Sequence, residues 1–356
     1  KYLAAQTRKN GLTEILIQKL ADGKNKTINF PEPVYTATIT GTPEYTSATL
    51  RYNYTSINRP NTVYDYDFSR GESIKLKEQE IPGGFNPDDY TVERLWATAP
   101  DGVKVPFSVV YKKSLKKDGS NPALLRSYGS YGISTEARFN ANFYSLIDRG
   151  FVLAIAQIRG GSDMGEQWYE EGKLLHKKNT FTDFIACAEK LEQDKYTSPS
   201  KLAITGGSAG GLLMGAVVNM RPDLFNTVVA AVPFVDVINT MLDASLPLTT
   251  QEYEEWGNPN LEEYYKYMLS YSPYDNIKAR KYPNMLCTAG LNDSQVSYHE
   301  PAKFVAKLRA TKTDNNILLL HTNMESGHGG ATGRFDALKE TAFQYAFILN
   351  RIGMAE

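Results

Sequence analysis

The amino-acid sequence predicts an α/β fold, in which a smaller all-β segment precedes a mostly parallel, doubly wound sheet. From about residue 122 onward, short runs of β-forming residues alternate with helical patterns, which is typical of a parallel sheet covered on both faces. Residues 1 to about 75 instead contain short β-like runs separated by Gly, Asn, Pro and Asp. We therefore expect two domains, residues 1–78 and residues 79–356.

Composition and charge exclude several classes of protein. The chain has 356 residues, of which 42% are hydrophobic and 22% are charged, as in an ordinary globular protein. Its net charge of -1 favours neither nucleic acid nor an anionic membrane as a partner, and no apolar run is long enough to span a bilayer. The two cysteines, Cys187 and Cys287, lie in apolar segments and are expected to be buried free thiols. A reducing compartment fits this usage, so we expect a cytoplasmic protein.

The first domain is expected to consist of short strands. Runs at residues 14–18, 37–41, 48–52 and 63–67 have the β-forming composition of strands and are bounded by turn residues. So few strands make a poor core by themselves, so they are expected to belong to a larger array, either a sandwich or a propeller. The chain opens with Lys1 inside β-like sequence, and we therefore expect that an N-terminal portion is missing.

The second domain begins with a linker and a hairpin. Residues 81–87 have the Pro- and Gly-rich composition of a linker, and strands at 91–97 and 103–110 flank a turn that contains Asp101-Gly102. Further strands are expected at residues 123–127, 151–157, 201–205, 227–232, 284–288 and 316–321, and helices at 138–149, 180–193, 209–220, 261–269, 298–309 and 334–351.

The segment 202–214 holds the first candidate catalytic residue. An apolar run ends at Gly206-Gly207, Ser208 follows, and Ala209-Gly210 opens an apolar helical pattern. This G-x-S-x-G pattern is typical of a strained strand-to-helix turn that projects a nucleophilic serine, with the N–H of the next residue as an oxyanion donor. An ordinary glycine-rich turn would give the same pentapeptide, so the rest of the chain has to decide.

Residues of the right type for a catalytic triad follow later strands. Of the four histidines, His328 stands out, because glycines flank it in a loop between the last strand and the last helix. Asp293 follows the preceding strand, where it could be a helix N-cap or could orient His328. The order Ser208, Asp293, His328 is the order found in α/β-hydrolases, so the set favours a serine hydrolase.

A second oxyanion donor should come from a loop after an earlier strand. Tyr128 lies in such a loop, and its hydroxyl could donate in place of a backbone N–H. Since the chain has 23 tyrosines, a core tyrosine at a turn is the alternative. The sequence has no Cys/His cluster with zinc spacing and no phosphate-binding glycine loop, so we expect no metal and no cofactor.

Taken together, the motifs resemble the prolyl oligopeptidase family of serine peptidases, and within it the branch that cleaves after basic residues. The resemblance covers nearly the whole chain from about residue 80 and rests on residues 127–132, 158–161, 172–181, 206–211, 247–259, 292–296 and 327–330. It implies an α/β-hydrolase domain preceded by the C-terminal part of a β-propeller, with Ser208, Asp293 and His328 as the triad and Tyr128 and Ala209 at the oxyanion. The missing propeller portion is then an expected partner of this chain.

The resemblance also implies which residues set specificity. Glu252 and Glu254 match the family's acidic pair for a basic substrate residue, with Glu252 preferred, and Phe234 matches an aromatic wall of the same pocket. Without the family, three glutamates in four residues would be interpreted as a solvated helix start. Gln295 stands where the proline-specific branch has arginine, which favours the basic-specific branch. A further acidic pair of some members corresponds to Glu136 and Arg138, where the second charge is reversed.

We therefore expect a serine endopeptidase that hydrolyses short peptides after Arg and Lys through an acyl-enzyme. The alternative on the same fold is an esterase or aminopeptidase without a preference for basic residues. A non-catalytic interaction protein that binds through its β-array is a third possibility, and the complete Ser/Asp/His set argues against it.

Overall fold

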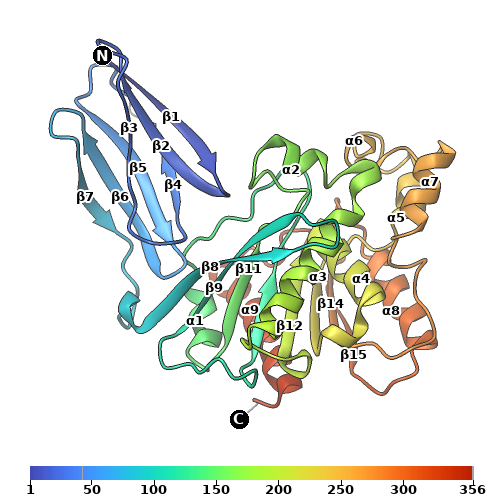
Figure 1. The fold of residues 1–356 in the computed structure, drawn as a ribbon. Coiled ribbons are helices and arrows are strands. Elements are labelled where there is room, and N and C mark those ends of the chain that lie inside the picture. The colour runs from blue at the N-terminus through green and yellow to red at the C-terminus, as the bar shows by residue number, and fades with distance from the viewer. Residues whose placement is uncertain (42, 355–356) are drawn as a thin grey trace.

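The computed structural model describes residues 1–41 and 43–354. Its chain forms two parts that are visibly separate in Figure 1: a β-rich part built from β1–β7, drawn in blue, and a larger α/β part with the C-terminus at its lower end. The predicted domain boundary at residues 78 and 79 falls directly after β7, the last strand of the β-rich part.

The α/β part is organised around one eight-stranded sheet with the order β15-β14-β13-β12-β10-β11-β9-β8. Strands β10 to β15 pair in parallel, whereas β9 pairs antiparallel with β11 and β8, so the prediction of a mostly parallel sheet is confirmed. The strands are β8 (Tyr90–Thr98), β9 (Lys104–Lys112), β10 (Ala123–Arg126), β11 (Val152–Ala156), β12 (Leu202–Gly207), β13 (Thr227–Ala231), β14 (Asn284–Gly290) and β15 (Leu318–Asn323).

Helices cover both faces of this sheet, as Figure 1 shows. Apolar residues of α3, α4 and α8 share one core, and those of α1 and α9 share the core on the opposite face. In β13 the side chains alternate between these cores, with Val228 in the first and Val229 in the second. The helices are α1 (Ala141–Ile147), α2 (Glu166–Glu170), α3 (Lys178–Gln193), α4 (Ala209–Met220), α5 (Val237–Leu242), α6 (Tyr253–Trp256), α7 (Glu262–Leu269), α8 (His299–Thr311) and α9 (Arg334–Ile352), with 3-10 turns η1 (Pro87–Asp89), η2 (Leu174–His176), η3 (Pro199–Lys201) and η4 (Pro222–Leu224).

Both cysteines are members of the first core. Cys187 on α3 and Cys287 on β14 are free and completely buried, as predicted. Burial raises the pKa of the Cys287 thiol to about 12 and that of Cys187 well above its usual range. Both groups are therefore protonated packing residues.

The β-rich part consists of two antiparallel sheets, β1-β2-β3 and β4-β5-β6-β7. Aromatic residues fill much of its core, including stacked Tyr52 and Tyr64 with ring centroids 5.4 Å apart. The four predicted strand regions coincide with parts of β2, β4, β5 and β6, whereas β1, β3 and β7 were not predicted. The strands are β1 (Tyr2–Lys9), β2 (Leu12–Lys19), β3 (Asn25–Thr27), β4 (Thr36–Ile39), β5 (Thr49–Ser56), β6 (Arg59–Asp67) and β7 (Glu72–Glu78).

A buried polar cluster joins the two parts near Asp163. Arg8 of β1 forms an ion pair with Glu136, and the Gln157 side-chain amide donates to the Gly11 carbonyl over 3.2 Å. Asp163 Oδ1 accepts hydrogen bonds from Gln157 and from the Thr135 N–H, but Oδ2 is buried and has no hydrogen-bond partner among the described residues. Burial raises the pKa of this carboxyl to about 7, although the nearby Arg8 charge acts in the opposite direction.

The topology brings the predicted site residues to one edge of the sheet. Tyr128 follows β10, Ser208 follows β12, Asp293 follows β14 and His328 follows β15. Parallel strands end at the same edge, where open α/β sheets form their sites. Within residues 1–41 and 43–354, none of the helices is both long and apolar enough to cross a membrane.

Candidate active site

Ser208 sits in a strained turn between β12 and α4. Its backbone angles are φ 57° and ψ -122°, a conformation that costs a non-glycine residue free energy and is held by its surroundings. The Ser208 N–H donates to the Ala231 carbonyl over 2.9 Å, and its own carbonyl accepts from the Phe234 N–H over 3.2 Å. The turn therefore projects the side chain at the N-terminal end of α4, where Ala209 provides the first N–H of the helix.

This turn requires glycine at two positions, because the atoms around them leave no room for a side chain. A Cβ on Gly206 would lie 2.3 Å from the Gly210 carbonyl oxygen, and a Cβ on Gly211 would lie 2.4 Å from the Cα of Pro233. Strand, turn and helix are thus in backbone contact, which explains why the sequence needs small residues on both sides of Ser208.

Asp293 and His328 form a hydrogen-bonded pair. His328 Nδ1 lies 2.8 Å from Asp293 Oδ2, and the Asp293 side chain is completely buried while that of His328 is 17% exposed. The other carboxylate oxygen accepts the N–H groups of Gln295 and Val296, each over 2.9 Å. Asp293 is therefore fixed by its own loop in the position from which it orients the imidazole.

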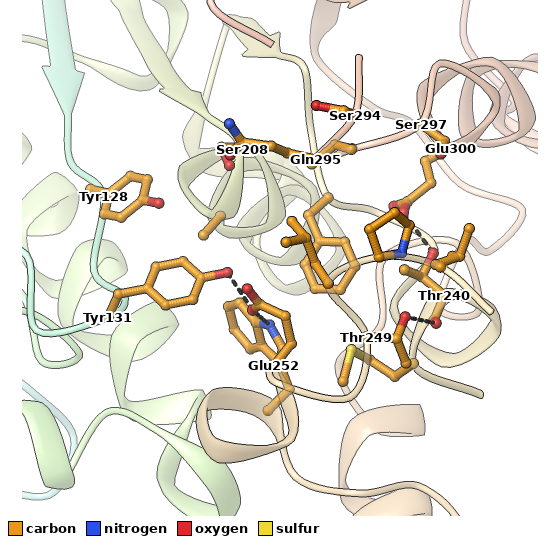
Figure 2. Close-up of a pocket in the computed structure, with 18 residues that line it drawn as sticks. Tyr128, Tyr131, Ser208, Thr240, Thr249, Glu252, Ser294, Gln295, Ser297 and Glu300 are labelled. Carbon is orange, nitrogen blue, oxygen red and sulfur yellow. Dashed lines mark hydrogen bonds between the residues drawn. The ribbon is translucent and has the colours of Figure 1, made fainter. Parts of the chain in front are cut away.

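A cavity of about 250 Å³ opens beside Ser208 (Figure 2). Tyr128, Ser208, Ala209, Phe234 and Glu252 all line it, so five of the predicted site residues come together. Asp293 and His328 lie outside the lining, although the segment that follows Asp293, residues 294–297, forms one wall. Ser208 and His328, which both belong to the described part of the chain, make no hydrogen bond with each other. A hydrogen bond between a nucleophile and its base often forms or shortens only when substrate binds.

Tyr128 is placed to donate a hydrogen bond at the Ser208 end of the cavity. Figure 2 shows its hydroxyl turned toward Ser208. Burial raises the pKa of Tyr128, although the neighbouring Ser208 side chain acts in the opposite direction. The hydroxyl therefore keeps its proton at neutral pH and is available to an oxyanion.

Glu252 carries the carboxylate at the other end of the cavity. Its Oε2 atom accepts hydrogen bonds from the Tyr131 hydroxyl and from Trp256 Nε1, each over 2.7 Å. Phe234 packs against Trp256 with ring centroids 5.3 Å apart, which gives the acidic end an aromatic wall. An acidic, aromatic pocket suits a cationic side chain.

The other two glutamates of this segment behave differently. Glu254 is exposed on α6 and does not line the cavity, so the structure does not bring it together with Glu252. Glu255 is 3% exposed and accepts from the Tyr131 N–H over 3.0 Å and from the Tyr169 hydroxyl over 2.7 Å. Lys177, itself 1% exposed, lies 4.0 Å from Glu255 and offsets its charge.

Lys177 also holds the loop that carries Tyr128 and Tyr131. Its Nζ donates to the Gly129 carbonyl over 2.6 Å and to the Ser130 hydroxyl over 2.8 Å. Burial lowers the pKa of Lys177 to about 8, and Glu255 acts in the opposite direction. Sequence reasoning missed Tyr131, Lys177 and Glu255; the only local signal was that Tyr131 belongs to the same loop as Tyr128.

The two positions of the further acidic pair differ: Arg138 is exposed, whereas Glu136 has partners in the β-rich part. Glu136 pairs with Arg8 and accepts from the Thr36 hydroxyl over 3.0 Å, so its carboxylate belongs to the contact between the two parts. No cluster of His, Cys, Asp and Glu suited to a metal ion occurs in the described residues.

Comparison with known proteins gives consistent results over both parts. A model of the prolyl oligopeptidase family matches residues 137–355, and a model of the prolyl oligopeptidase N-terminal β-propeller domain matches residues 1–79. The predicted terminal part of a β-propeller is thereby confirmed.

The similar proteins include peptidases with several names. Protease 2 of Moraxella lacunata is 49% identical over 98% of this chain and 50% of its own length, and dipeptidyl aminopeptidase BI of Pseudoxanthomonas mexicana is 47% identical over 98% and 48%. The solved structure of oligopeptidase B from Leishmania major superposes with a TM-score of 0.94 at 48% identity, over 100% of this chain and 51% of that one. Oligopeptidase B from Trypanosoma brucei with covalently bound antipain gives 0.93 at 48% identity, over 99% and 51%. The chain thus spans about half the length of the relatives it matches.

Proposed function

The chain belongs to the prolyl oligopeptidase family, and on that premise we propose that it is the catalytic part of a serine oligopeptidase that cleaves short peptides after Arg and Lys. The observation that carries the proposal is that Ser208, Tyr128 and Glu252 line the same cavity. It joins a nucleophile, an oxyanion donor and a carboxylate for a cation. The name of the similar oligopeptidase B structures supports the oligopeptidase part of this proposal.

The chemistry is acyl transfer. His328 takes the proton from the Ser208 hydroxyl as the oxygen attacks the substrate carbonyl carbon, and Asp293 stabilises the resulting imidazolium through Nδ1. The Tyr128 hydroxyl and the Ala209 N–H donate to the oxyanion. His328 then protonates the leaving amine, and a water molecule hydrolyses the acyl-enzyme by the reverse sequence of proton transfers.

Specificity comes from the acidic end of the cavity. The substrate side chain that precedes the cleaved bond would extend past Phe234 toward Glu252, where its cation pairs with the carboxylate and stacks on the aromatic wall. A neutral side chain would leave Glu252 without a charged partner and would gain less binding free energy.

The test is kcat/KM on matched peptide amides that end in Arg, Lys, Pro and Ala, with Ser208→Ala as the inactive control. A preference of about 10³ for Arg and Lys over Ala, lost in the control, is the expected result. A flat profile, or a preference for Pro, would overturn the assignment of Glu252.

A second candidate is an aminopeptidase, because one relative at 47% identity bears the name dipeptidyl aminopeptidase BI. The two activities differ in whether a free substrate amine is needed. N-blocked and free substrates that share the same Arg residue discriminate them, since an endopeptidase cleaves the blocked peptide and an aminopeptidase does not.

The proposed partners are short peptides that contain basic residues and the remainder of the β-propeller. The two free, buried thiols support a reducing, cytoplasmic location.

A further inference from the structure

The two carboxylate oxygens of Glu252, at the acidic end of the cavity, accept different numbers of hydrogen bonds. Glu252 Oε2 already accepts two hydrogen bonds, from the Tyr131 hydroxyl and from Trp256 Nε1, each over 2.7 Å. No hydrogen bond to Oε1 is recorded for this described residue. A carboxylate oxygen can accept about two hydrogen bonds. Oε2 therefore has no acceptor position left, whereas Oε1 can still accept hydrogen bonds from a ligand.

We propose that Tyr131 is a specificity-determining residue whose hydroxyl occupies Glu252 Oε2, so that a substrate cation meets one free carboxylate oxygen and the preference for Arg over Lys is kept small. The proposal rests on the serine oligopeptidase function proposed above. It concerns the choice between two basic side chains, which the presence of Glu252 by itself does not determine.

The physical argument lies in the different shapes of the two cations. A guanidinium binds a carboxylate best through two parallel N–H···O bonds, one to each oxygen. An ammonium is a compact point charge that needs no such fork. Filling Oε2 therefore removes the second bond from Arg while it costs Lys little.

Tyr131 is held in place by contacts on its backbone as well as its hydroxyl. Its φ of 58° is a left-handed conformation that a bulky residue adopts only when its surroundings require it. The Tyr131 N–H donates to Glu255 over 3.0 Å, and Lys177 binds the two preceding residues of the loop. The hydroxyl therefore returns to the same carboxylate oxygen rather than moving freely.

The protonation state of Tyr131 fits the role of a donor. Burial and the nearby Glu252 charge raise the pKa of Tyr131 well above its usual range, so the hydroxyl keeps its proton at any working pH. Figure 2 shows the ring extending across the cavity wall, with its hydroxyl on Glu252 rather than on Ser208.

The other carboxylates near the cavity do not provide a second site for the cation. Glu255 is paired with Lys177, as described above. Glu300 also lines the cavity, but its Oε2 accepts the Val235 and Asp236 N–H groups and its Oε1 accepts the Thr240 hydroxyl over 2.6 Å. Both oxygens of Glu300 thus accept hydrogen bonds from the protein, whereas Oε1 of Glu252 accepts none from the described residues.

The experiment compares Tyr131→Phe with the unchanged protein on matched amides ending in Arg, Lys and citrulline, the neutral counterpart of Arg. Removing the hydroxyl frees one acceptor position on Oε2, so Arg gains a charge-assisted hydrogen bond. The ratio of kcat/KM for Arg over Lys should rise by about tenfold, with no matching gain for citrulline. Tyr265→Phe on α7 removes the same atom outside the cavity and should leave the ratio unchanged.

The possible outcomes distinguish a failure of the role proposed for Tyr131 from a failure of the proposed function, cleavage after Arg and Lys. If the unchanged protein prefers basic residues and Tyr131→Phe leaves the Arg to Lys ratio within twofold, or lowers it, the inference is wrong and the function stands. If the unchanged protein shows no preference for Arg or Lys over citrulline, the proposed function is wrong and the inference fails with it. Thermal unfolding of both variants checks that the fold is retained.

Discussion

Asp293 holds His328 with one carboxylate oxygen and its own loop with the other. The Oδ2–Nδ1 distance is 2.8 Å, and Oδ1 accepts two backbone N–H groups. Because the two oxygens have separate tasks, a substitution can remove one task and leave the other.

Asp293→Asn should do so, since an amide oxygen can still accept from the backbone while the amide nitrogen faces His328. The imidazole is then held in the wrong tautomer, and kcat should fall by about 10⁴. Steady-state kinetics checks this, and an unchanged melting temperature shows that the loop is intact. A loss of less than tenfold would remove Asp293 from the triad.

Tyr128→Phe should slow the chemistry without weakening substrate binding. In the proposed mechanism the Tyr128 hydroxyl donates to an oxyanion that exists only after attack, so we expect kcat to fall by about 10² to 10³ with KM nearly constant. Single-turnover kinetics with an activated ester measures the acylation step directly. A rise in KM at constant kcat would instead make Tyr128 a wall of the binding pocket.

Glu252→Gln should lower kcat/KM for Arg amides by about 10² or more and affect citrulline amides little, because only the cation loses a charged partner. Glu254→Gln is a matched control two residues away, with the same chemical change on an exposed side chain outside the cavity lining. We expect a much smaller loss there. Equal losses in both variants would assign the cation site to the pair of glutamates and not to Glu252 alone.

Gly206→Ala should destabilise the fold, because the new Cβ would lie 2.3 Å from the Gly210 carbonyl oxygen and neither backbone can move away. A loss of about 3 kcal/mol in the free energy of unfolding is expected, measured by urea denaturation. Gly41→Ala, where a Cβ would meet nothing within 4 Å, is the control. Equal stability of the two variants would contradict the close contact of β12 and α4.

Asp163→Asn should change how stability depends on pH. The folded-state pKa of Asp163, about 7, lies above its ordinary value of 3.8, so unfolding releases a proton between these values and stability falls as pH rises through that window. Asn has no such proton. The melting temperature of Asp163→Asn relative to the unchanged protein should therefore increase from pH 5 to pH 8, with Arg8 and Glu136 facing the site throughout. A pH-independent difference would show that Asp163 is ionised in both states.

Local sequence determined much of this site. The apolar run of β12, the glycines and the helical pattern of α4 specify the turn at Ser208 without reference to distant residues. His328 and Asp293 were predicted because parallel strands end at one edge, so a loop position is enough to place them. Tyr128 followed from the same argument.

The acidic end of the cavity could not be resolved in this way. Glu252, Glu254 and Glu255 differ only in the direction in which a one-turn helix points them, and residues three apart share a face while the intervening one points away. The orientation of this short helix is determined by Trp256 and by the distant Tyr131 and Lys177.

Strand β7 could not be predicted from the sequence for a different reason. Its residues are all exposed, so they lack the alternation of apolar and polar residues that marks a half-buried strand.

The complete burial of Cys187 and Cys287 has a practical consequence for spectroscopy. A thiol reacts with maleimides and iodoacetamides as the thiolate, and these two groups are both shielded and protonated at neutral pH. A single cysteine introduced on an exposed position can therefore carry a fluorophore or spin label without first removing the native pair. One such label on β7 and a second on α7 would report the distance between the β-rich part and the α/β part in the presence of substrate.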